Sequence, residues 1–257
     1  MPHAICLLSV VPMRKEPSHR SEMVSQVLFG EYVTIQEEKD DFVFVRCDYD
    51  GYEGWVQAAQ LTQVSEHEVL QTNSYTTNFT TPVTHNQTLL HVPYAAPVYQ
   101  PGRFSFQVAG NNINYLVVPQ QTVNSGGQLF NGPTLTAVCQ PLLNAPYLWG
   151  GKSVFGIDCS GFVQQVFKLF GIKLLRDAYL QAGQGIAINS LEDARLGDLA
   201  FFCNEAGRVT HVGIILEDGK IVHASGRVRI DTIDKEGILN IENGKRTHMM
   251  HSIRRYF

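Results

Sequence analysis

The stretch Tyr147-Leu-Trp-Gly-Gly151, followed by Asp158-Cys159-Ser160-Gly161, leads into a run of residues with helical periodicity. The apolar side chains of residues 162–170 fall on one face of a helix, and Gly171 is a natural stop. This spacing predicts a helix that begins near Cys159. Unpaired N–H groups and the macrodipole at a helix start favour negative charge, so a thiol there is expected to lose its proton more readily. We interpret Cys159 as a candidate nucleophile; the alternative is a buried structural cysteine.

Two histidines follow in a segment with the pattern of a β-hairpin, which turns at Glu217-Asp-Gly219. A two-residue Asp-Gly turn would pair Gly213 with Ala224 and place the histidines on opposite faces. A three-residue loop with a left-handed glycine would pair Gly213 with His223 and place both histidines on one face. We favour the three-residue loop, because a cysteine enzyme needs a base and a group that orients the base. His211 is then the expected base, His223 orients it, and Gly213 leaves room between them.

Together these motifs resemble the NlpC/P60 family of papain-like cysteine peptidases, which act on bacterial cell-wall peptides. The resemblance covers residues 142–233 and includes Tyr-x-Trp-Gly-Gly, Asp-Cys-Ser-Gly, Gly197-Asp-Leu-Ala-Phe-Phe202, His-Val-Gly-Ile and a second histidine, in the order of the family. It implies that Cys159 is the nucleophile, His211 the base and His223 the third polar residue. It also implies that the Tyr147 hydroxyl lies near the nucleophile, where it would stabilise the oxyanion together with the Cys159 backbone N–H.

Composition narrows the range of partners and compartments. The net charge of −4 and the lack of a Lys/Arg-rich run give no reason to expect nucleic acid or an anionic membrane as partner. Five scattered cysteines without a C-x-x-C pair argue against a disulfide framework or a zinc knuckle, and fit a reducing compartment. We expect neither metal nor cofactor. The apolar residues 4–11 lack a basic flank and predict a first strand, so we expect a cytoplasmic protein; a periplasmic one is the alternative if a signal peptide is missing.

The chain divides into three predicted domains. Residues 1–62 show short β-branched and aromatic runs between turn signals, and their Gly-Tyr-x-Gly-Trp-Val motif resembles a bacterial SH3-like barrel. Residues 63–135 are rich in Thr, Asn, Gln and Pro; a second, degenerate SH3-like barrel is favoured over a disordered linker, because aromatic residues recur and charge is low. Residues 136–257 are expected to be an α+β papain-like (NlpC/P60) catalytic domain, with the helix first and an antiparallel sheet after it. Two small all-β barrels thus precede the catalytic domain.

This architecture resembles the γ-D-glutamyl-L-diamino acid endopeptidases of murein-peptide recycling. The resemblance implies that the first barrel blocks one end of the groove and selects a murein tri- or tetrapeptide with a free N-terminal L-Ala. The bond cleaved would join D-Glu to diaminopimelate or lysine, through a thioester on the cysteine. Residues implied for the N-terminal amine are Asp158, Ser160, Glu22 and Tyr52; those implied for the rest of the peptide are Asp177 for its backbone, Arg176 for the D-Glu carboxylate, and Arg227 and Arg229 for the diamino acid.

Three other interpretations remain open from the sequence. A papain-like amidase or acyltransferase would use the same three side chains on another acyl group. A non-catalytic cell-wall-binding module would rely on the barrels alone. A Cys/His/His zinc site would use the same residue types, but the paired spacing usual for zinc is absent.

Overall fold

The structure is a computed structural model and describes residues 1–99, 105–115, 122–126 and 130–257. Residues of the first predicted domain form a seven-stranded antiparallel sheet in the order β3-β2-β6-β5-β4-β1-β7. Alternate residues of these strands fill one core, which includes Val11, Val33 and Val45. The strands are β1 (His3–Ile5), β2 (Val10–Arg14), β3 (Met23–Leu28), β4 (Tyr32–Lys39), β5 (Phe42–Cys47), β6 (Glu53–Gln57) and β7 (Thr62–Val64), with the 3₁₀ helix η1 (Ala58–Gln60) before β7.

The prediction of one strand over residues 4–11 is wrong, because the chain turns a corner between β1 and β2. The N–H of Cys6 donates to the carbonyl of Glu31, and the N–H of Gly30 donates back to Cys6. These two hydrogen bonds join the residue after β1 to the turn between β3 and β4, and β1 ends there. The predicted bend at Phe29-Gly-Glu31 is confirmed by the break between β3 and β4.

The described residues between the first sheet and the helices form two further β-sheets. The larger has the order β10-β9-β12-β11, and the smaller pairs β13 with β8. Apolar residues such as Val83, Val92 and Ile113 pack in one core with Ile5 and Phe29 of the first domain. The alternative of a disordered linker therefore fails for these residues. The elements are η2 (Glu66–Glu68), β8 (Ser74–Thr76), β9 (Thr80–His85), β10 (Thr88–Pro93), β11 (Ser105–Val108), β12 (Asn111–Tyr115) and β13 (Thr122–Asn124).

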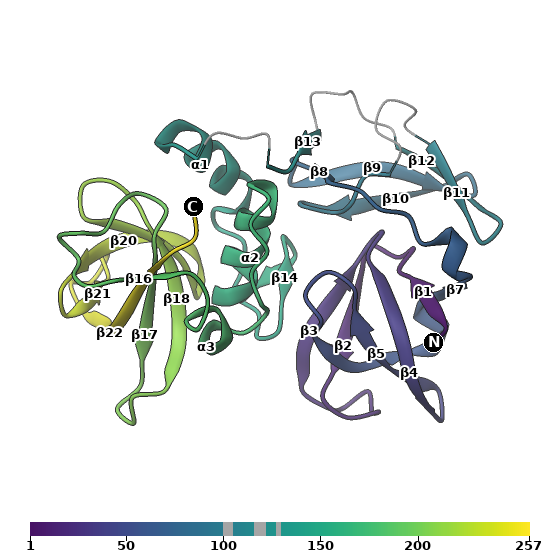
Figure 1. The fold of residues 1–257 in the computed structure, drawn as a ribbon, viewed down its shortest axis with the longest axis horizontal. Helices are drawn as coiled ribbons and strands as arrows, with labels where there is room; N and C mark the ends of the chain where they lie inside the picture. The colour runs from purple at the N-terminus through teal and green to yellow at the C-terminus, as the bar shows by residue number, and fades with distance from the viewer. Residues whose placement is uncertain (100–104, 116–121, 127–129) are drawn as a thin grey trace.

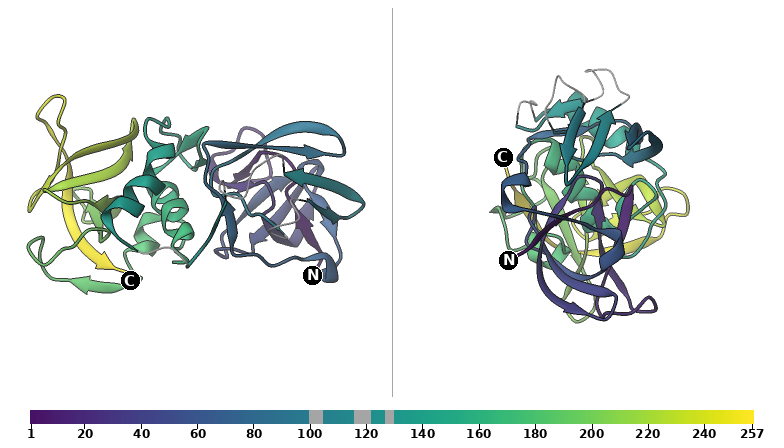
Figure 2. Two further views of the ribbon diagram at one scale, coloured as in Figure 1. Left: turned by 90° about the horizontal axis from the view of Figure 1, so that it is seen from above. Right: turned by 90° about the vertical axis from the view of Figure 1, so that its right-hand side faces the viewer.

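The C-terminal half places helices against a second seven-stranded sheet, in the order β16-β22-β17-β18-β19-β20-β21. The helices lie between this sheet and the N-terminal β domains (Figures 1 and 2). Pairing of β22 with β21 as well as β17 confirms that the tail closes the sheet. The elements are α1 (Gly132–Cys139), η4 (Gln140–Leu142), β14 (Lys152–Ser153), β15 (Gly156–Ile157), α2 (Cys159–Leu169), α3 (Ala178–Gln181), β16 (Ile186–Ile188), β17 (Leu199–Cys203), β18 (Val209–Ile215), β19 (Lys220–Ser225), β20 (Arg227–Asp234), β21 (Gly237–Leu239) and β22 (Arg246–Arg255). None of the helices in the described part of the chain combines the length and apolar character that a membrane crossing requires.

Strand β17 is buried on both faces, as its uniformly apolar sequence predicts. Leu199 and Phe201 pack into the core that surrounds α2. Ala200 and Phe202 pack into a separate core on the opposite face of the sheet. The sheet that carries the two candidate histidines is therefore held rigidly from both sides.

Helix α2 is buried around its whole circumference, although its sequence predicts only one apolar face. The first barrel covers the polar face and supplies partners there. Glu31 Oε2 lies 2.8 Å from Lys152 Nζ, Glu31 Oε1 lies 3.2 Å from Lys168 Nζ, and Gln164 Nε2 donates to Asp50 at 2.8 Å. These paired groups satisfy the requirement that buried charges be compensated, and they join the barrel to the helix that carries Cys159.

Candidate active site

Helix α2 begins at Cys159 because Asp158 caps it. The Asp158 carboxylate accepts the N–H of Gly161 at 2.7 Å, which satisfies one of the unpaired donors of the first turn. It also accepts the N–H of Gly150 at 3.0 Å, and so ties the helix start to the preceding glycine pair. The Asp-Cys-Ser-Gly motif is therefore explained locally: the aspartate is needed for the cap, and the cysteine follows it as the first helical residue.

Arg176 has a structural role that excludes the predicted contact with a substrate carboxylate. Its side chain is buried, and its five N–H groups donate to Ser25 Oγ, Ser160 Oγ, the Gly151 carbonyl and both carboxylate oxygens of Asp158. The prediction for Arg176 is wrong, because no N–H group is left for a ligand. The same network binds the side chains of Asp158 and Ser160, so Arg176 already balances the Asp158 charge that was predicted to hold an ammonium.

The Tyr-x-Trp-Gly-Gly motif brings the first barrel against the catalytic domain. Gly150 has φ +74°, and a Cβ there would lie 2.4 Å from the carbonyl oxygen of Met23 in β3, so only glycine fits. The neighbouring Trp149 donates its indole N–H to Glu22 at 2.8 Å across the same domain boundary. Sequence analysis did not single out Trp149 by itself, and its position beside a glycine pair is the signal that could have found it.

The thiol of Cys159 is buried, and burial raises its pKa to about 12, with a smaller contribution in the same direction from Asp158. Backbone hydrogen bonds from Val212 in β18 and from Ser160 at the helix start lower the pKa, but they do not outweigh burial. Burial therefore opposes the ionisation that the helix start is expected to favour. Sγ lies 4.0 Å from the carbonyl oxygen of Thr210, the residue before His211. Removal of the thiol proton thus needs a neighbouring base.

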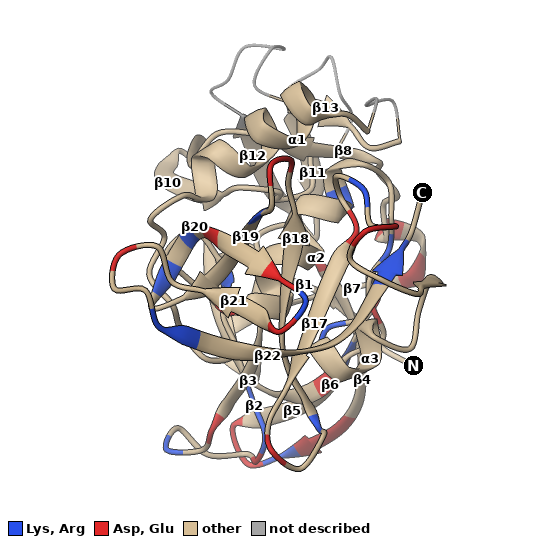
Figure 3. Ribbon diagram, turned by 90° about the vertical axis from the view of Figure 1, so that its left-hand side faces the viewer, with Lys and Arg blue, Asp and Glu red and all other residues tan. Residues whose placement is uncertain are grey.

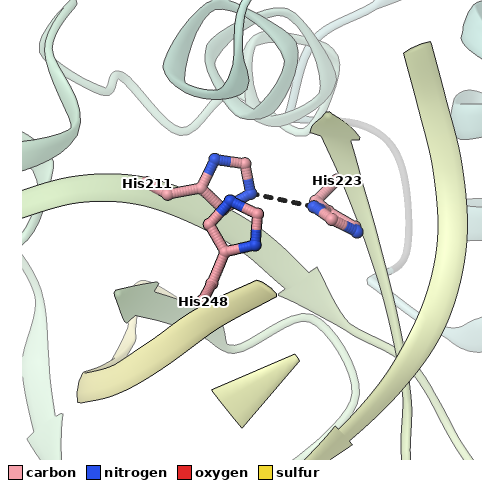
Figure 4. Close-up of side chains that lie close together, drawn as sticks. All are labelled: His211, His223 and His248. Carbon is pink, nitrogen blue, oxygen red and sulfur yellow. Dashed lines mark hydrogen bonds between the residues drawn. The ribbon is translucent and has the colours of Figure 1, made fainter. Parts of the chain in front are cut away.

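The β18–β19 hairpin has the predicted register. Gly213 pairs with His223, and the turn contains Gly219 at φ +64°. Both histidines lie on one face, with His211 Nε2 2.8 Å from His223 Nδ1 (Figure 4). A Cβ on Gly213 would lie 2.9 Å from the Cβ of His223. A side chain at position 213 would also press against Ile221, whose Cδ1 would lie 2.7 Å from the added Cβ, so the close approach of β18 and β19 here requires glycine.

A carboxylate that sequence analysis missed sets the tautomers of both rings. His223 Nε2 lies 3.0 Å from Asp231 Oδ2. An ionised carboxylate only accepts, so Nε2 of His223 carries the hydrogen and its Nδ1 accepts the Nε2–H of His211. The lone pair of His211 is then on Nδ1. Asp231 lies two residues beyond Arg229, the β-sheet partner of His223, and the alternating polar residues of β20 are the signal that could have found it.

Burial raises the pKa of Asp231, but hydrogen bonds from Ile241 N–H, His223 and Arg229 outweigh it and lower the pKa overall. Arg229 and Arg227 also pair with Glu242, at 2.9 and 2.6 Å. Basic and acidic residues lie next to one another near β20 and β22 (Figure 3). The prediction that these two arginines hold a substrate carboxylate is wrong, because their charges are already paired and neither residue lines the cleft around Cys159.

A third imidazole, also missed by sequence analysis, stacks on His211. The ring of His248 from β22 lies 4.0 Å from the His211 ring, with 24° between their planes (Figure 4). Burial lowers the pKa of His211, and the positive charges that His248 and His223 could carry lower it further. Burial likewise lowers the pKa of His223, and brings that of His248 to about 4. All three rings are therefore neutral near pH 7.

A cleft of about 770 Å³ lies between the first barrel and the start of α2. It brings together seven of the residues that the sequence singled out, but His211, His223 and Arg176 do not line it. The barrel contributes Glu22 and Tyr52. The catalytic domain contributes Tyr147, Asp158, Cys159, Ser160 and Asp177. The pKa of the Tyr147 hydroxyl is raised to about 12 by burial and by the neighbouring Cys159, so it is a hydrogen-bond donor at neutral pH.

Asp177 is the half-buried carboxylate of this cleft. The Tyr52 hydroxyl donates to its two oxygens, each at 3.3 Å. Asp177 precedes α3, but its side chain does not cap this helix. In the part of the chain that the structure describes, Asp177 forms no salt bridge, and burial raises its pKa. The charge of the neighbouring Arg176 lowers this pKa but does not outweigh burial, so the carboxylate lies in the cleft with no cation in direct contact among the described residues.

Comparisons with known proteins match a family model to each of the two domains that line the cleft. The model of the NlpC/P60 family matches residues 144–245, and a model described as a bacterial dipeptidyl-peptidase Sh3 domain matches residues 13–61. The first match includes Cys159, His211 and His223. The second includes Glu22 and Tyr52, the residues that the barrel contributes to the cleft.

Curated relatives and solved structures extend the similarity over most of the chain. The γ-D-glutamyl-L-lysine dipeptidyl-peptidase of Bacillus subtilis is 31% identical over 217 residues, which are 78% of this chain and 71% of that protein. The protein of the same description from Bacillus cereus is 28% identical over 258 residues, 90% of this chain and 77% of that protein. The crystal structure of an NlpC/P60 family protein from Bacillus cereus has a TM-score of 0.80 at 23% identity, and covers 99% of both chains. This likeness confirms the expected fold: an α+β catalytic domain after SH3-like β domains.

Proposed function

The chain belongs to the NlpC/P60 family of cysteine peptidases, and from this premise we propose that it hydrolyses the bond between γ-linked D-Glu and diaminopimelate or lysine in free murein peptides. The substrate is a tri- or tetrapeptide with an unblocked N-terminal L-Ala. The first barrel selects that terminus, and the start of α2 carries out the chemistry. The two Bacillus relatives are named for a γ-D-glutamyl-L-lysine bond, which supports this bond type.

The observation that carries the proposal is the unpaired carboxylate of Asp177 in the same cleft as Cys159. A half-buried charge without a partner is unfavourable, and a bound ammonium would compensate it. The N-terminal amine of a short peptide supplies such an ammonium at a fixed distance from the scissile bond. Glu22 and the Tyr52 hydroxyl lie in the same cleft and complete a polar site for it.

The contact between Trp149 and Glu22 supports selection of a free terminus. It joins the catalytic domain to the barrel through a 2.8 Å hydrogen bond at the cleft. A peptide still attached to sugar would have to extend through this contact. We therefore propose that the groove accepts two residues before the scissile bond and excludes longer stems.

Cleavage proceeds through a thioester. Nδ1 of His211 accepts the thiol proton, and Sγ of Cys159 forms a bond to the γ-carbonyl carbon of D-Glu. The backbone N–H of Cys159, unpaired at the helix start, and the Tyr147 hydroxyl donate to the oxyanion. The imidazolium then gives its proton to the amine of the departing diamino acid, and water attacks the thioester to release L-Ala-D-Glu. His223 and Asp231 keep His211 in the tautomer that presents Nδ1.

We place the reaction in cytoplasmic recycling of cell-wall peptides. The five cysteines are all unpaired, and a reducing compartment keeps the Cys159 thiol available. Fractionation of the native host, with the protein detected in the periplasm or outside the cell, would contradict this part of the proposal.

Mass spectrometry of products from synthetic L-Ala-γ-D-Glu-diaminopimelate and its lysine analogue tests the function. We expect L-Ala-D-Glu and the free diamino acid from the wild type. Cys159→Ala should lower kcat by roughly 10⁴-fold or more, whereas the matched variant Cys203→Ala, in β17, should retain activity. The N-acetylated peptides should be cleaved at least about 100-fold more slowly. Equal cleavage of free and acetylated peptides would refute terminus selection, and full activity of Cys159→Ala would refute the mechanism.

A further inference from the structure

Three imidazoles from three strands converge in the catalytic domain, and peptide hydrolysis by thioester chemistry requires only two of them. His211, His223 and His248 each present one ring nitrogen within 4.8 Å of the others (Figure 4). His248 comes from β22, at the end of the chain, and is only half-buried. The cluster can therefore be reached from solvent on the side of β22.

The arrangement of the nitrogens is close to that of a metal site with three histidine ligands. His211 Nε2 and His223 Nδ1 are 2.8 Å apart, whereas two nitrogens bound to one tetrahedral zinc ion are about 3.3 Å apart. A separation greater by about 0.5 Å, with a small approach of His248, would accommodate the ion. His248 Nδ1 contacts Thr247 Oγ1 at 2.8 Å, which leaves Nε2 for the cluster.

His223 is already oriented as a ligand. Its Nε2 is held by Asp231 at 3.0 Å, and its Nδ1 points at His211. A carboxylate that accepts the second N–H of a ligating imidazole is a recurrent feature of protein metal sites, where it fixes the ring and its tautomer. In this protein, Asp231 is the carboxylate and His223 is the imidazole that it holds.

We propose that His211, His223 and His248 bind a divalent transition metal ion of the zinc type, and that the bound ion reversibly switches the peptidase off. Neutral imidazole nitrogens are preferred ligands of such ions, and three of them with one open position make a complete tetrahedral site with a water molecule. Cys159 takes no part in the site.

The inhibitory effect rests on the proposed function, in which Nδ1 of His211 receives the thiol proton. A metal ion on Nε2 of His211 displaces the hydrogen that this atom shares with His223. A neutral imidazole keeps one hydrogen, which then resides on Nδ1. That nitrogen has no lone pair left for the thiol, so Cys159 stays protonated. Loss of the ion restores the active tautomer.

Metal binding can be measured without activity in the Cys159→Ala protein. Titration with zinc chloride in a calorimeter should show one ion per chain. Adding His248→Phe, which keeps an aromatic ring on His211 but removes the ligand, should weaken binding by at least the roughly 10–100-fold typical of a lost supporting partner. Adding His251→Phe, an exposed histidine of the same strand, should leave binding unchanged. Equal zinc affinity with and without His248 would overturn the proposal.

Cobalt(II) chloride as a probe tests whether sulfur participates. The wild type and Cys159→Ala should give the same visible bands of a tetrahedral nitrogen–oxygen site. An intense thiolate-to-cobalt band in the wild type would place the ion on Cys159 and overturn the proposal.

Inhibition is then measured on the murein tripeptide in active protein. Zinc should inhibit the wild type and His251→Phe at the same concentration, and His248→Phe should need at least about tenfold more. If all three are inhibited equally, the proposal is overturned. If the wild type shows no peptide cleavage, the proposed function fails, while the calorimetric and cobalt results still decide the metal site.

Discussion

The interface between the first barrel and the catalytic domain contains two groups of charges that differ in one respect. In its buried part, Glu31 contacts both Lys152 and Lys168, so its carboxylate is compensated within the protein. At the cleft, Asp177 has the Tyr52 hydroxyl as its neighbour but forms no salt bridge among the described residues. Among the described residues, Glu22 there has one ion-pair neighbour, the exposed Lys15 at 3.8 Å, and it also accepts the indole N–H of Trp149.

The pKa values follow the same division. Burial raises the pKa of Glu31, but Lys152 and Lys168 outweigh it and hold the value at about 2. Burial also raises the pKa of Asp177, and here the opposing contributions do not prevail. The two domain faces thus give the buried carboxylate of Glu31 two direct cation partners, whereas the carboxylate of Asp177 has none among the described residues. Under the proposed function, the cation that compensates this carboxylate is the N-terminal ammonium of the substrate.

Removing the buried carboxylate should have the largest effect. Glu31→Ala leaves Lys152 and Lys168 buried without a countercharge, and we expect a loss of about 3–5 kcal/mol in the free energy of unfolding. Urea denaturation measures it, with exposed Glu38→Ala as the matched control. The triple variant Glu31→Leu, Lys152→Met, Lys168→Met should recover most of the loss. A Glu31→Ala protein as stable as Glu38→Ala would show that this part of the interface is not held by its charges.

Lowering the pH should reduce the stabilisation that the Glu31 carboxylate provides. A lowered pKa in the folded state means that the stabilisation by Glu31 is fully present above its ordinary value of 4.5 and is lost as pH falls from 4.5 to about 2. The loss corresponds to roughly 3 kcal/mol. Urea midpoints between pH 5 and pH 2.5 measure it. Glu31→Gln should flatten this dependence, and an unchanged slope in that variant would contradict the assignment.

Sequence analysis located the reacting groups because their signals are local. The helix start at Cys159 follows from a capping aspartate and apolar spacing. The meeting of His211 and His223 follows from hairpin register, in which Gly213 must face His223. Each depends on residues close together in the chain, where periodicity and turn chemistry are informative.

The errors and omissions concern contacts between distant segments. Arg176 was assigned to substrate because nothing near it in sequence shows that Ser25 and Asp158 enclose its guanidinium. The thiol was expected to ionise easily because the helix start is visible in the sequence, whereas the burial that raises its pKa is not. His248, in the last strand, reaches the histidine pair only through the closure of the sheet. Tertiary packing decides all three.

Replacing the unpaired carboxylate should change catalysis and spare the fold. For Asp177→Asn we expect kcat/KM on the free-amine tripeptide to fall about 100-fold, about 2.7 kcal/mol, because the substrate ammonium loses its countercharge. On the N-acetylated peptide the residual rate should stay within about twofold of the wild type, since no ammonium is present. Asp218→Asn, in an exposed turn outside the cleft, is the matched control. An equal loss on both peptides would show that Asp177 acts on the fold or on the chemistry, and not on the terminus.

The smallest effect should come from the hydroxyl groups of two tyrosines that lie in the two parts of this interface. Tyr52→Phe removes the donor to Asp177, a hydrogen bond that lowers the pKa of this carboxylate, so the carboxylate should hold an ammonium less well. We expect kcat/KM on the free-amine peptide to fall about fivefold, about 1 kcal/mol, mainly through KM. Tyr49→Phe keeps the ring that Lys168 contacts at 4.4 Å and should leave kinetics unchanged. If both variants lose activity equally, the two hydroxyl groups act through packing between the domains. The Tyr52 hydroxyl would then have no special role in helping Asp177 to bind the substrate ammonium.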